Sequence, residues 1–532
     1  MTFRVQSSRA TICAHRELLL AVAACLLTMV RTAAGAEEQF SIMEYRVLHN
    51  TTLSTRQVEA AVYPHLGPNK TLVDVQAARA DLEKAYHEAG YSTVFVDIPE
   101  QTVDSGIVRL QVTEGRLERV RVVGSRYFSS RRILASIPSL AEGQVPHFPE
   151  VQSDLARLNR ESPDLSVAPI LRAGPDPGTT DVDLKIKDTL PLHASAELNN
   201  RYSPDTAHDR VNVNVSYGNL FQREQSLSLT YQTAPSDTKD ATVLSGTYVA
   251  PVGNGGDNFS LYGVKTDSNV AAIGTIAVIG KGKIFGSRYT LALPSFGSFY
   301  PSMVFGVDFK DFEENTLLSS GSLQTPIKYL NWSALYGAAL QTGKATTTFD
   351  VGANFGIRGL LNSTDAFEAK RYLARPDYFY LRFDASHDQP LFFGTDLALR
   401  LLGQFTSEPL IDNEQFSIGG VQSVRGYLES EALGDTGASG SLELRSPSLP
   451  SLLGVTVHEV YVYVFYDGGI VAIIDPLPQQ SARMDLVSSG LGFRVIGFAG
   501  FDASLDWAKV HVTSAYERSG DSRVQFHIRY AF

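Results

Sequence analysis

The chain has little cysteine and no long apolar run after its first segment, and each absence excludes a class of structure. Its 532 residues include only two cysteines, Cys13 and Cys25. Both precede the expected processing point after residue 36, so we expect no disulfide in the mature protein. Beyond that point no segment offers about eighteen continuous apolar residues, which excludes a transmembrane helix. If such a chain spans a membrane, it can do so only as a closed barrel.

The first residues have the pattern of a secretory signal peptide. Three arginines precede an apolar run at 18–30, and the small residues 34–36 follow it. This order predicts a signal peptide at 1–36, cleaved after Ala36. A lipoprotein signal ending at Cys25 is the alternative, but the apolar run continues past that cysteine.

Basic charge is also scarce, and so are the motifs of enzymes. The chain has 46 Lys and Arg against 57 Asp and Glu, a net charge of −11. Nucleic acid binding requires a basic face, so we expect no nucleic acid partner. The sequence contains no H-E-x-x-H motif, no P-loop and no Cys/His metal spacing. We therefore expect no enzymatic activity, no metal and no cofactor.

The segment 40–188 repeats one small unit. The first copy is predicted to contain two helices between strands, at 40–48, 54–66, 72–89, 93–98 and 106–113. The second copy has the same β-α-α-β-β order, at 117–123, 130–137, 150–160, 166–171 and 181–187. Two successive copies indicate a tandem array of one module.

From Pro191 onward, apolar and polar residues alternate in segments of roughly ten residues. We count about sixteen such segments, and their length is close to that of a tilted membrane strand. A soluble β-sandwich alternates in the same way, but the C-terminus favours a barrel. A soluble protein that ends on an apolar strand exposes an aggregation-prone edge, and barrel closure removes that edge. The apolar positions of this last segment are Val524, Phe526, Ile528, Tyr530 and Phe532.

A glycine-rich segment, 416–437, interrupts the strand pattern. It contains Phe416-Ser-Ile-Gly-Gly-Val-Gln-Ser-Val-Arg-Gly-Tyr427 and continues to Leu433-Gly-Asp-Thr-Gly437. It resembles the signature loop of two-partner secretion transporters, the haemolysin secretion/activation family. The family's Val-Arg-Gly-Tyr core falls on Val424, Arg425, Gly426 and Tyr427, and its Phe-x-Asp-x-Gly strand motif falls on Phe465, Asp467 and Gly469.

The resemblance covers the whole mature chain. Val112–Gly115 and Val123-Gly124 match the junction between two POTRA domains, the family's periplasmic modules. It implies a mostly β fold, with two α+β POTRA domains before a transmembrane antiparallel β-barrel of about 16 strands. The implied domains are a signal peptide at 1–36, POTRA domains at 37–115 and 116–189, and a barrel at 190–532.

The resemblance also assigns roles to the motif residues. It implies that the 416–437 loop folds into the barrel lumen, where Arg425 pairs with Asp467 and controls gating. The strand pattern agrees, because Asp467 shares one face with Tyr461, Tyr463 and Phe465, whereas Val460, Val462, Val464 and Tyr466 form the apolar, lipid-facing side. An ordinary solvated loop arginine is the alternative. We expect Phe526, Ile528, Tyr530 and Phe532 to be the C-terminal signal for the barrel assembly machinery.

The function implied is export of one unfolded partner exoprotein, an adhesin, cytolysin or similar protein, across the outer membrane. The partner would bind the POTRA domains in the periplasm and pass through a monomeric barrel in contact with outer-membrane lipid. The alternatives are an outer-membrane assembly or insertion factor and a passive channel with porin activity. Few residues separate Ala36 from Phe40, so we expect no N-terminal plug helix, and this leaves the resting seal to the loop around Arg425.

Overall fold

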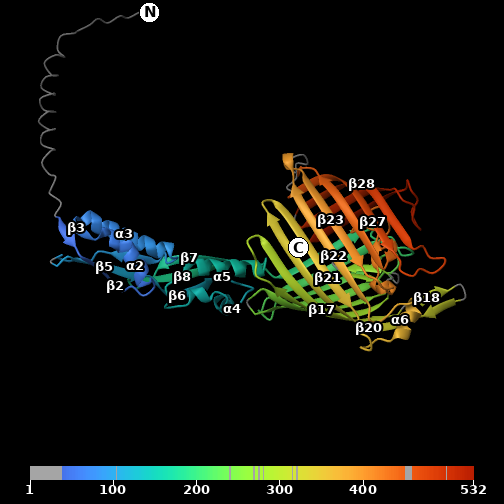
Figure 1. Ribbon diagram of the computed structural model, residues 1–532, viewed down its shortest axis with the longest axis horizontal. Coiled ribbons are helices and arrows are strands. Elements are labelled where there is room, and N and C mark those ends of the chain that lie inside the picture. Colours follow the sequence, from blue (N-terminus) through green and yellow to red (C-terminus); the bar gives the residue numbers. More distant parts are fainter. Residues whose placement is uncertain are drawn as a thin grey trace, which may run out of the picture. The chain divides into compact units, whose positions relative to one another are not determined.

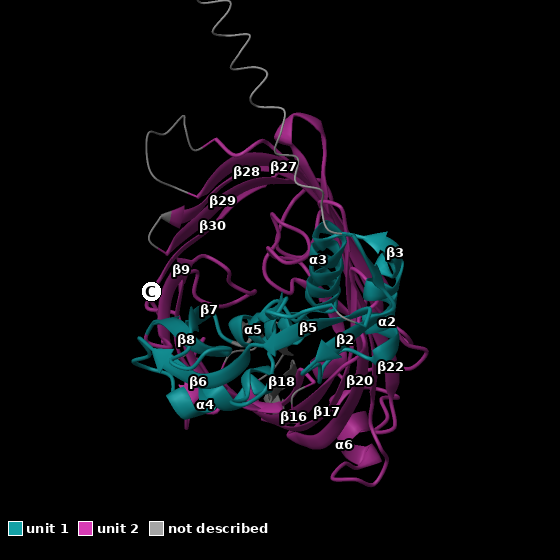
Figure 2. Cartoon of the chain, turned by 90° about the vertical axis from the view of Figure 1, so that its left-hand side faces the viewer, with its two compact units in different colours: residues 1–189 teal, residues 190–532 magenta. Residues whose placement is uncertain are grey.

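The computed structural model describes residues 39–532 except 104, 239–240, 254, 268–269, 274–275, 280, 314, 319–320, 450–457 and 499. The expected signal peptide at 1–36 lies outside the described residues, as do the two positions that follow it, where no plug helix is expected. The chain divides into two compact units, Met1–Thr189 and Leu190–Phe532, which Figure 2 colours separately. In the described part of the chain, no helix has the length and apolarity needed to cross a membrane.

The first half of the N-terminal unit is a three-stranded sheet packed against two helices. Its sheet has the order β2-β5-β4, in which β5 pairs parallel with β2 and antiparallel with β4. Helix α3 begins with the predicted capping box, since the Thr71 amide donates to Asp74 Oδ2 at 2.8 Å. The elements are β1 (Phe40–Ile42), β2 (Glu44–Leu48), α2 (Thr55–Val62), η1 (Tyr63–His65), β3 (Gly67–Lys70), α3 (Leu72–Glu88), β4 (Val94–Asp97) and β5 (Ile107–Glu114).

The second half repeats this arrangement. Its sheet has the order β6-β8-β7. Strand β8 pairs parallel with β6 and antiparallel with β7, as β5 does with β2 and β4 in the first half. The elements are β6 (Arg116–Val123), α4 (Ser130–Ala135), η2 (Pro138–Leu140), α5 (Phe148–Glu161), β7 (Leu165–Ala173) and β8 (Thr179–Asp188). The β-α-α-β-β order therefore recurs, and the α+β character predicted for this region is confirmed.

Glu114 ties together the segments that meet at the junction of the two halves. Its carboxylate accepts hydrogen bonds from the amides of Thr51 at 2.7 Å and Thr52 at 3.0 Å. Arg116 donates to the other carboxylate oxygen at 3.1 Å and to the Gly143 carbonyl in the second half at 3.3 Å. Burial raises the pKa of Glu114, but the hydrogen bonds from the two threonines outweigh it and leave this pKa below its usual value.

The C-terminal unit is a closed antiparallel barrel of 16 strands, which confirms the predicted fold class. Figure 2 shows the strands as a ring, and Figure 1 shows the barrel from the side. The barrel strands are β9 (Leu192–Asn199), β10 (Arg210–Leu220), β11 (Gln225–Thr233), β12 (Val243–Val252), β13 (Asp257–Thr266), β16 (Gly282–Ala292), β17 (Phe299–Phe312), β20 (Ile327–Thr342), β21 (Ala345–Phe355), β22 (Phe379–Pro390), β23 (Asp396–Phe405), β26 (Thr436–Arg445), β27 (Glu459–Ala472), β28 (Arg483–Phe498), β29 (Phe501–Val510) and β30 (Ser522–Ala531). The last strand closes on the first between His527↔Asn199 and Ala531↔Ser195.

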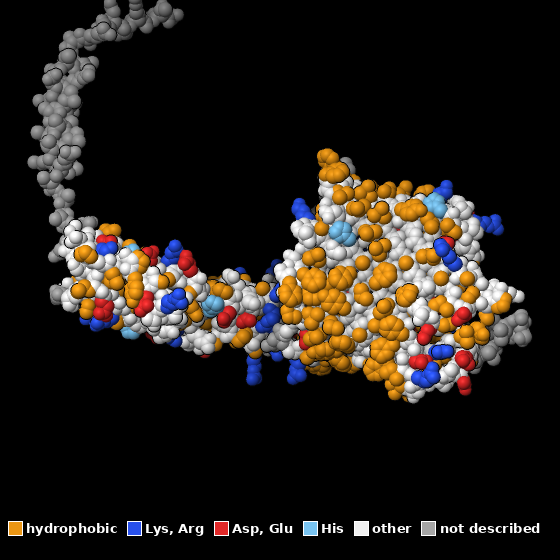
Figure 3. Space-filling model, viewed as in Figure 1, with side chains coloured by type: hydrophobic (Ala, Val, Ile, Leu, Met, Phe, Trp, Pro, Cys, Tyr) orange, Lys and Arg blue, Asp and Glu red, His pale blue; other side chains and the backbone are white. Residues whose placement is uncertain are grey.

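The strand pleat separates an apolar outer face from the lumen. On β27 the side chains of Val462, Val464 and Tyr466 are exposed, whereas Phe465 and Asp467 are buried. Asp467 therefore points into the barrel, because side chains alternate between the two faces of a strand. Figure 3 shows apolar side chains spread over the outer surface of the barrel. This is the surface that a membrane-spanning barrel presents to lipid.

The connections at one end of the barrel carry further structure. We call this the far end, because it lies opposite the end at which β9 begins after the N-terminal unit. Because neighbouring strands are antiparallel, every second connection between strands lies at the far end. The connections 356–378 and 406–435 are two of these. The far-end elements are β14 (Val270–Ile273), β15 (Ile276–Ile279), β18 (Asn315–Leu318), β19 (Gly321–Gln324), α6 (Thr364–Lys370), η4 (Asp412–Glu414), β24 (Phe416–Ile418) and β25 (Ala432–Gly434). The short turn η3 (Phe392–Gly394) lies at the other end.

Candidate functional site: a loop locked inside the barrel

The predicted signature loop, 416–437, turns back from the far end into the lumen. Its root is a small sheet in which β24 pairs with β25. Its tip reaches inward-facing residues of two separate strands, since Arg425 contacts Asp467 on β27 and Gly426 contacts Gln525 on β30. The tip therefore lies among the barrel strands and not above them.

Arg425 and Asp467 form a buried bidentate ion pair. The guanidinium donates from Nε to Asp467 Oδ2 at 2.8 Å and from Nη2 to Oδ1 at 2.9 Å. The backbone amide of Arg425 adds a third bond to Oδ2 at 3.1 Å. Arg425 is 6 % exposed and Asp467 is 1 % exposed. Two parallel bonds to a carboxylate fix orientation as well as distance, so this pair sets where the loop tip sits.

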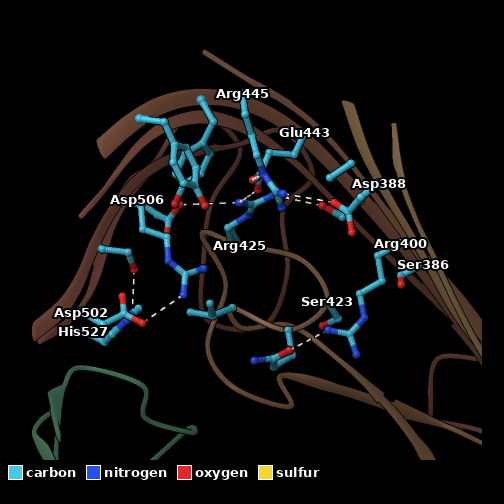
Figure 4. Close-up of a pocket in the computed structure, with 18 of the residues that line it drawn as sticks. Ser386, Asp388, Arg400, Ser423, Arg425, Glu443, Arg445, Asp502, Asp506 and His527 are labelled. Carbon is cyan, nitrogen blue, oxygen red and sulfur yellow. Dashed lines mark hydrogen bonds and ion pairs between the residues drawn. The ribbon is translucent and has the colours of Figure 1, made fainter. Parts of the chain in front are cut away.

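Two further carboxylates complete the surroundings of Arg425. Its Nη1 donates to Glu443 Oε2 on β26 at 2.9 Å and lies 3.6 Å from Asp506 Oδ1 on β29. Glu443 is shared, because Arg445 donates to its other oxygen at 2.7 Å. Figure 4 shows these charged side chains converging around Arg425. The buried positive charge is thus surrounded by acidic groups from three strands.

The strand motif Phe-x-Asp-x-Gly fits the loop at all three of its positions. The Arg425 guanidinium carbon lies 3.5 Å from the ring centre of Phe465, a cation–π contact. Asp467 forms the bidentate ion pair with the Arg425 guanidinium. A side chain at Gly469 would meet Val424 and Ile418 of the loop, since an added Cβ would lie 3.0 Å from Val424 Cγ2. We call Arg425, Phe465, Asp467 and Glu443 the luminal lock.

Gly426 and Tyr427 attach the loop tip to β30 and to the segment that follows β29. Gly426 has a φ of +90°, a conformation that side chains disfavour, and an added Cβ would lie 3.0 Å from Ala508 Cβ. Its amide donates to Gln525 Oε1 at 2.9 Å. The buried Tyr427 hydroxyl donates at 2.7 Å to the backbone carbonyl of Val512, which lies two residues after β29. The structure thus brings all seven residues of the two predicted motifs into one assembly.

A charged cavity of about 430 Å³ adjoins the lock inside the barrel (Figure 4). Its lining combines both signs of charge and includes Arg400, Arg425, Arg445, Arg494, Asp388, Glu443, Asp502 and Asp506. Among the residues that the structure describes, no group of three His, Cys, Asp or Glu side chains is placed to hold a metal. The cavity therefore offers a polar lumen wall that carries both signs of charge.

The predicted C-terminal signal residues lie elsewhere. Ile528, Tyr530 and Phe532 are exposed on the outer side of β30, and Phe526 is partly exposed. The inward side of the same strand supplies Gln525 to the loop. Sequence reasoning missed Gln525, Glu443 and Asp506. The alternation along their strands could have predicted that these side chains face the lumen. Only the register between strands, however, places them next to Arg425.

Comparison with known proteins identifies the family. The family model described as haemolysin secretion/activation protein ShlB/FhaC/HecB matches residues 178–495, and a ShlB-type POTRA domain model matches residues 40–115. The outer membrane transporter CdiB of Dickeya dadantii (strain 3937) is 24% identical over 426 residues, which is 78% of this chain and 74% of that protein.

Solved structures share the fold. CdiB from Escherichia coli has a TM-score of 0.62 at 19% identity, covering 99% of this chain and 100% of that one. BamA from Haemophilus ducreyi lacking POTRA domains 1-3 has a TM-score of 0.56 at 16% identity, covering 93% and 100%. At these identities the structural likeness shows the fold alone. The family model, however, spans more than half of the sequence, so this chain belongs to the haemolysin secretion/activation family of ShlB, FhaC and HecB.

Proposed function

We propose that this protein is an outer-membrane transporter of two-partner secretion, which exports an unfolded partner exoprotein through its barrel. The observation that carries the proposal is the luminal lock, in which both motifs of the family meet inside a closed barrel. A static pore has no need for a loop held across its lumen by a buried ion pair. A transporter that must seal at rest and open for a polypeptide has such a need.

The partner would dock on the two predicted POTRA domains, 37–115 and 116–189, in the periplasm. In the described part of each three-stranded sheet, the two outer strands pair on one side only. An extended segment of the partner can add to such an edge through main-chain hydrogen bonds, which require little side-chain specificity. This mode suits an unfolded chain, whose backbone groups are available.

Export then requires the loop tip to leave its seat at Asp467. The cavity next to the lock is lined by both positive and negative side chains, which can solvate a polar backbone without selecting one amino-acid sequence. The sequence offers no P-loop, so we assign the driving force to folding of the partner outside the cell. We assign no catalytic step and no cofactor to the barrel.

The remaining assignments concern the barrel itself. Its apolar outer face fits outer-membrane lipid, and one chain closes the barrel, so we propose a monomer. The outward-facing Phe526, Ile528, Tyr530 and Phe532 at the end of β30 are proposed to be read by the barrel assembly machinery. The signal peptide at 1–36 would direct the chain to the periplasm first.

A proteome comparison tests the proposal. Culture medium and outer membrane would be compared between cells with the gene, cells without it, and cells that carry an Arg358→Ala variant as a control, because Arg358 belongs to an exposed ion pair outside the lock and the cavity. We expect loss of one large secreted or surface protein in the deletion strain, with other barrels unchanged. Broad depletion of other barrels would instead indicate an assembly factor. Unaltered export together with a steady pore in planar bilayers would indicate a passive channel.

A further inference from the structure

The root of the signature loop is held by a second set of buried charges, away from Arg425. Glu414 is 1 % exposed and lies in η4, just before the loop. It accepts hydrogen bonds from Lys310 Nζ on β17 and Tyr329 Oη on β20, both at 2.5 Å, and from Tyr380 Oη on β22 at 2.7 Å. One side chain thus attaches the segment before the loop to three strands of the barrel wall.

Asp435 forms the matching anchor where the loop ends. It is fully buried, and Arg371 donates to both of its oxygens, at 2.7 Å and 2.9 Å. Backbone amides of Leu410 and Ile474 and the side chain of Gln415 donate to the same carboxylate at 2.7–3.0 Å. Because Arg371 follows α6, this pair joins the 356–378 connection to the root of the signature loop.

Between these anchors lies an apolar cluster, which we call the far-end cluster. It combines residues of six barrel strands and three residues of the 356–378 connection with two residues just before the signature loop: Val243, Val264, Ile284, Phe312, Ile327, Tyr329, Phe367, Ala374, Tyr378, Tyr380, Leu410 and Ile411. Phe367 of α6 packs edge-on against Tyr329 at 5.5 Å between ring centres. Figure 1 shows α6 next to β20.

The strand members of the far-end cluster face the lumen. On the same strands the neighbouring side chains Leu244, Phe285 and Phe379 are exposed on the outer face. Alternation along each strand therefore turns Val243, Ile284 and Tyr380 inward. An apolar cluster inside the lumen excludes water, and apolar constrictions are one way in which channels close.

We infer that Glu414 and Asp435 position a second barrier in the lumen, formed by the far-end cluster, and that opening requires the release of these anchors as well as of the luminal lock. Five of the twelve cluster residues belong to two connections rather than to strands, so this part of the barrier can move without opening the barrel wall. The Arg371–Asp435 pair makes those connections move together. The inference rests on the proposed function in treating the lumen as the export route.

Resting conductance of the purified full-length protein in planar bilayers tests this barrier. The variants are Glu414→Gln and Asp435→Asn, which keep side-chain size and remove charge. Arg358→Gln is the matched control, because Arg358 and Asp377 form an ion pair in the same connection with side chains 59% and 41% exposed. Loss of one charge-assisted hydrogen bond corresponds to about tenfold in an equilibrium constant. We therefore expect at least a tenfold rise in open fraction for both test variants and no change for the control.

Several outcomes separate this barrier from mere structural support. Test variants that melt at lower temperature but conduct as Arg358→Gln does would overturn the inference. If the charge variants do not assemble, the double variant Tyr329→Phe and Tyr380→Phe removes two donors to Glu414 without changing charge. We expect a several-fold rise in the open fraction of this double variant. A resting current equal to wild type in this double variant also overturns it. Partner export is measured separately in cells. A wild-type protein that exports nothing contradicts the proposed function, whereas the conductance of the variants tests the barrier independently of export.

Discussion

Replacing Arg425 with alanine removes the charge at the centre of the luminal lock. The change deletes four side-chain hydrogen bonds, two to Asp467 and one each to Glu443 and Ser441. It leaves Asp467 buried with two donors, the Ser441 hydroxyl at 2.7 Å and the amide of residue 425 at 3.1 Å. Asp506, which is also buried, loses its nearest cation.

The size of the effect follows from this geometry. Breaking a buried ion pair costs about 3–5 kcal/mol, and the two remaining donors place the cost for Asp467 at about the lower limit. About 3 kcal/mol shifts the equilibrium between the seated and unseated loop roughly a hundredfold. Arg425→Lys should recover only part of this, because an ammonium group cannot form the paired bonds to a carboxylate.

The assay combines resting conductance in planar bilayers with export of the partner in cells. Arg358→Ala is the matched control, since Arg358 lies outside the luminal lock and the cavity lining and pairs with Asp377 while 59% exposed. An exposed pair contributes less than about 1 kcal/mol, or roughly fivefold. We expect Arg425→Ala to raise the resting current and abolish export, with Arg358→Ala near wild type. If Arg425→Ala exports normally and conducts as Arg358→Ala does, the loop has no gating role.

Three further outcomes follow from local geometry. Gly426→Ala should lower stability by about 1–2 kcal/mol because of the φ of +90° and the contact with Ala508, read as a shift of the unfolding midpoint in detergent. Tyr427→Phe removes a buried hydroxyl donor and should cost about 1 kcal/mol in the same assay, whereas an unchanged midpoint would contradict this. The lowered pKa of Glu114 means that its contribution to stability is complete above about pH 4.3 and disappears as pH falls through the folded pKa. Glu114→Gln should therefore weaken the acid-induced rise in hydrogen exchange of residues 40–115, and an identical pH profile would refute this assignment.

Local patterns were sufficient to predict the elements that positioned the site. Alternation along β27 predicted an inward Asp467, and the sequence of α3 predicted its capping box. The small β1–β3 sheet was missed, because β3 contains Gly67, Pro68 and Asn69, a composition typical of turns. Asn69 has a φ of +55°, as a turn residue does.

Partners on other strands could not be predicted, because they depend on register. Ser441 stands opposite Asp467 only through the pairing of β26 with β27, and a shift of one residue would turn it to the other face. The anchors at Glu414 and Asp435 depend on contacts with β17, β20, β22 and the 356–378 connection. Nothing in the spacing of the sequence places these segments together, so the sequence pointed to a resting seal at Arg425 alone.

The spacing of the strand motif has a consequence for assembly of the barrel. Phe465, Asp467 and Gly469 stand at every second position of β27, and each of them touches the signature loop. If β27 paired one residue out of step, Tyr466 and Gly468 would face the lumen, and none of the three contacts could form. The contacts of the loop with β27 can therefore form only in a barrel whose strands are correctly aligned, so a seated loop is a mark of correct strand register.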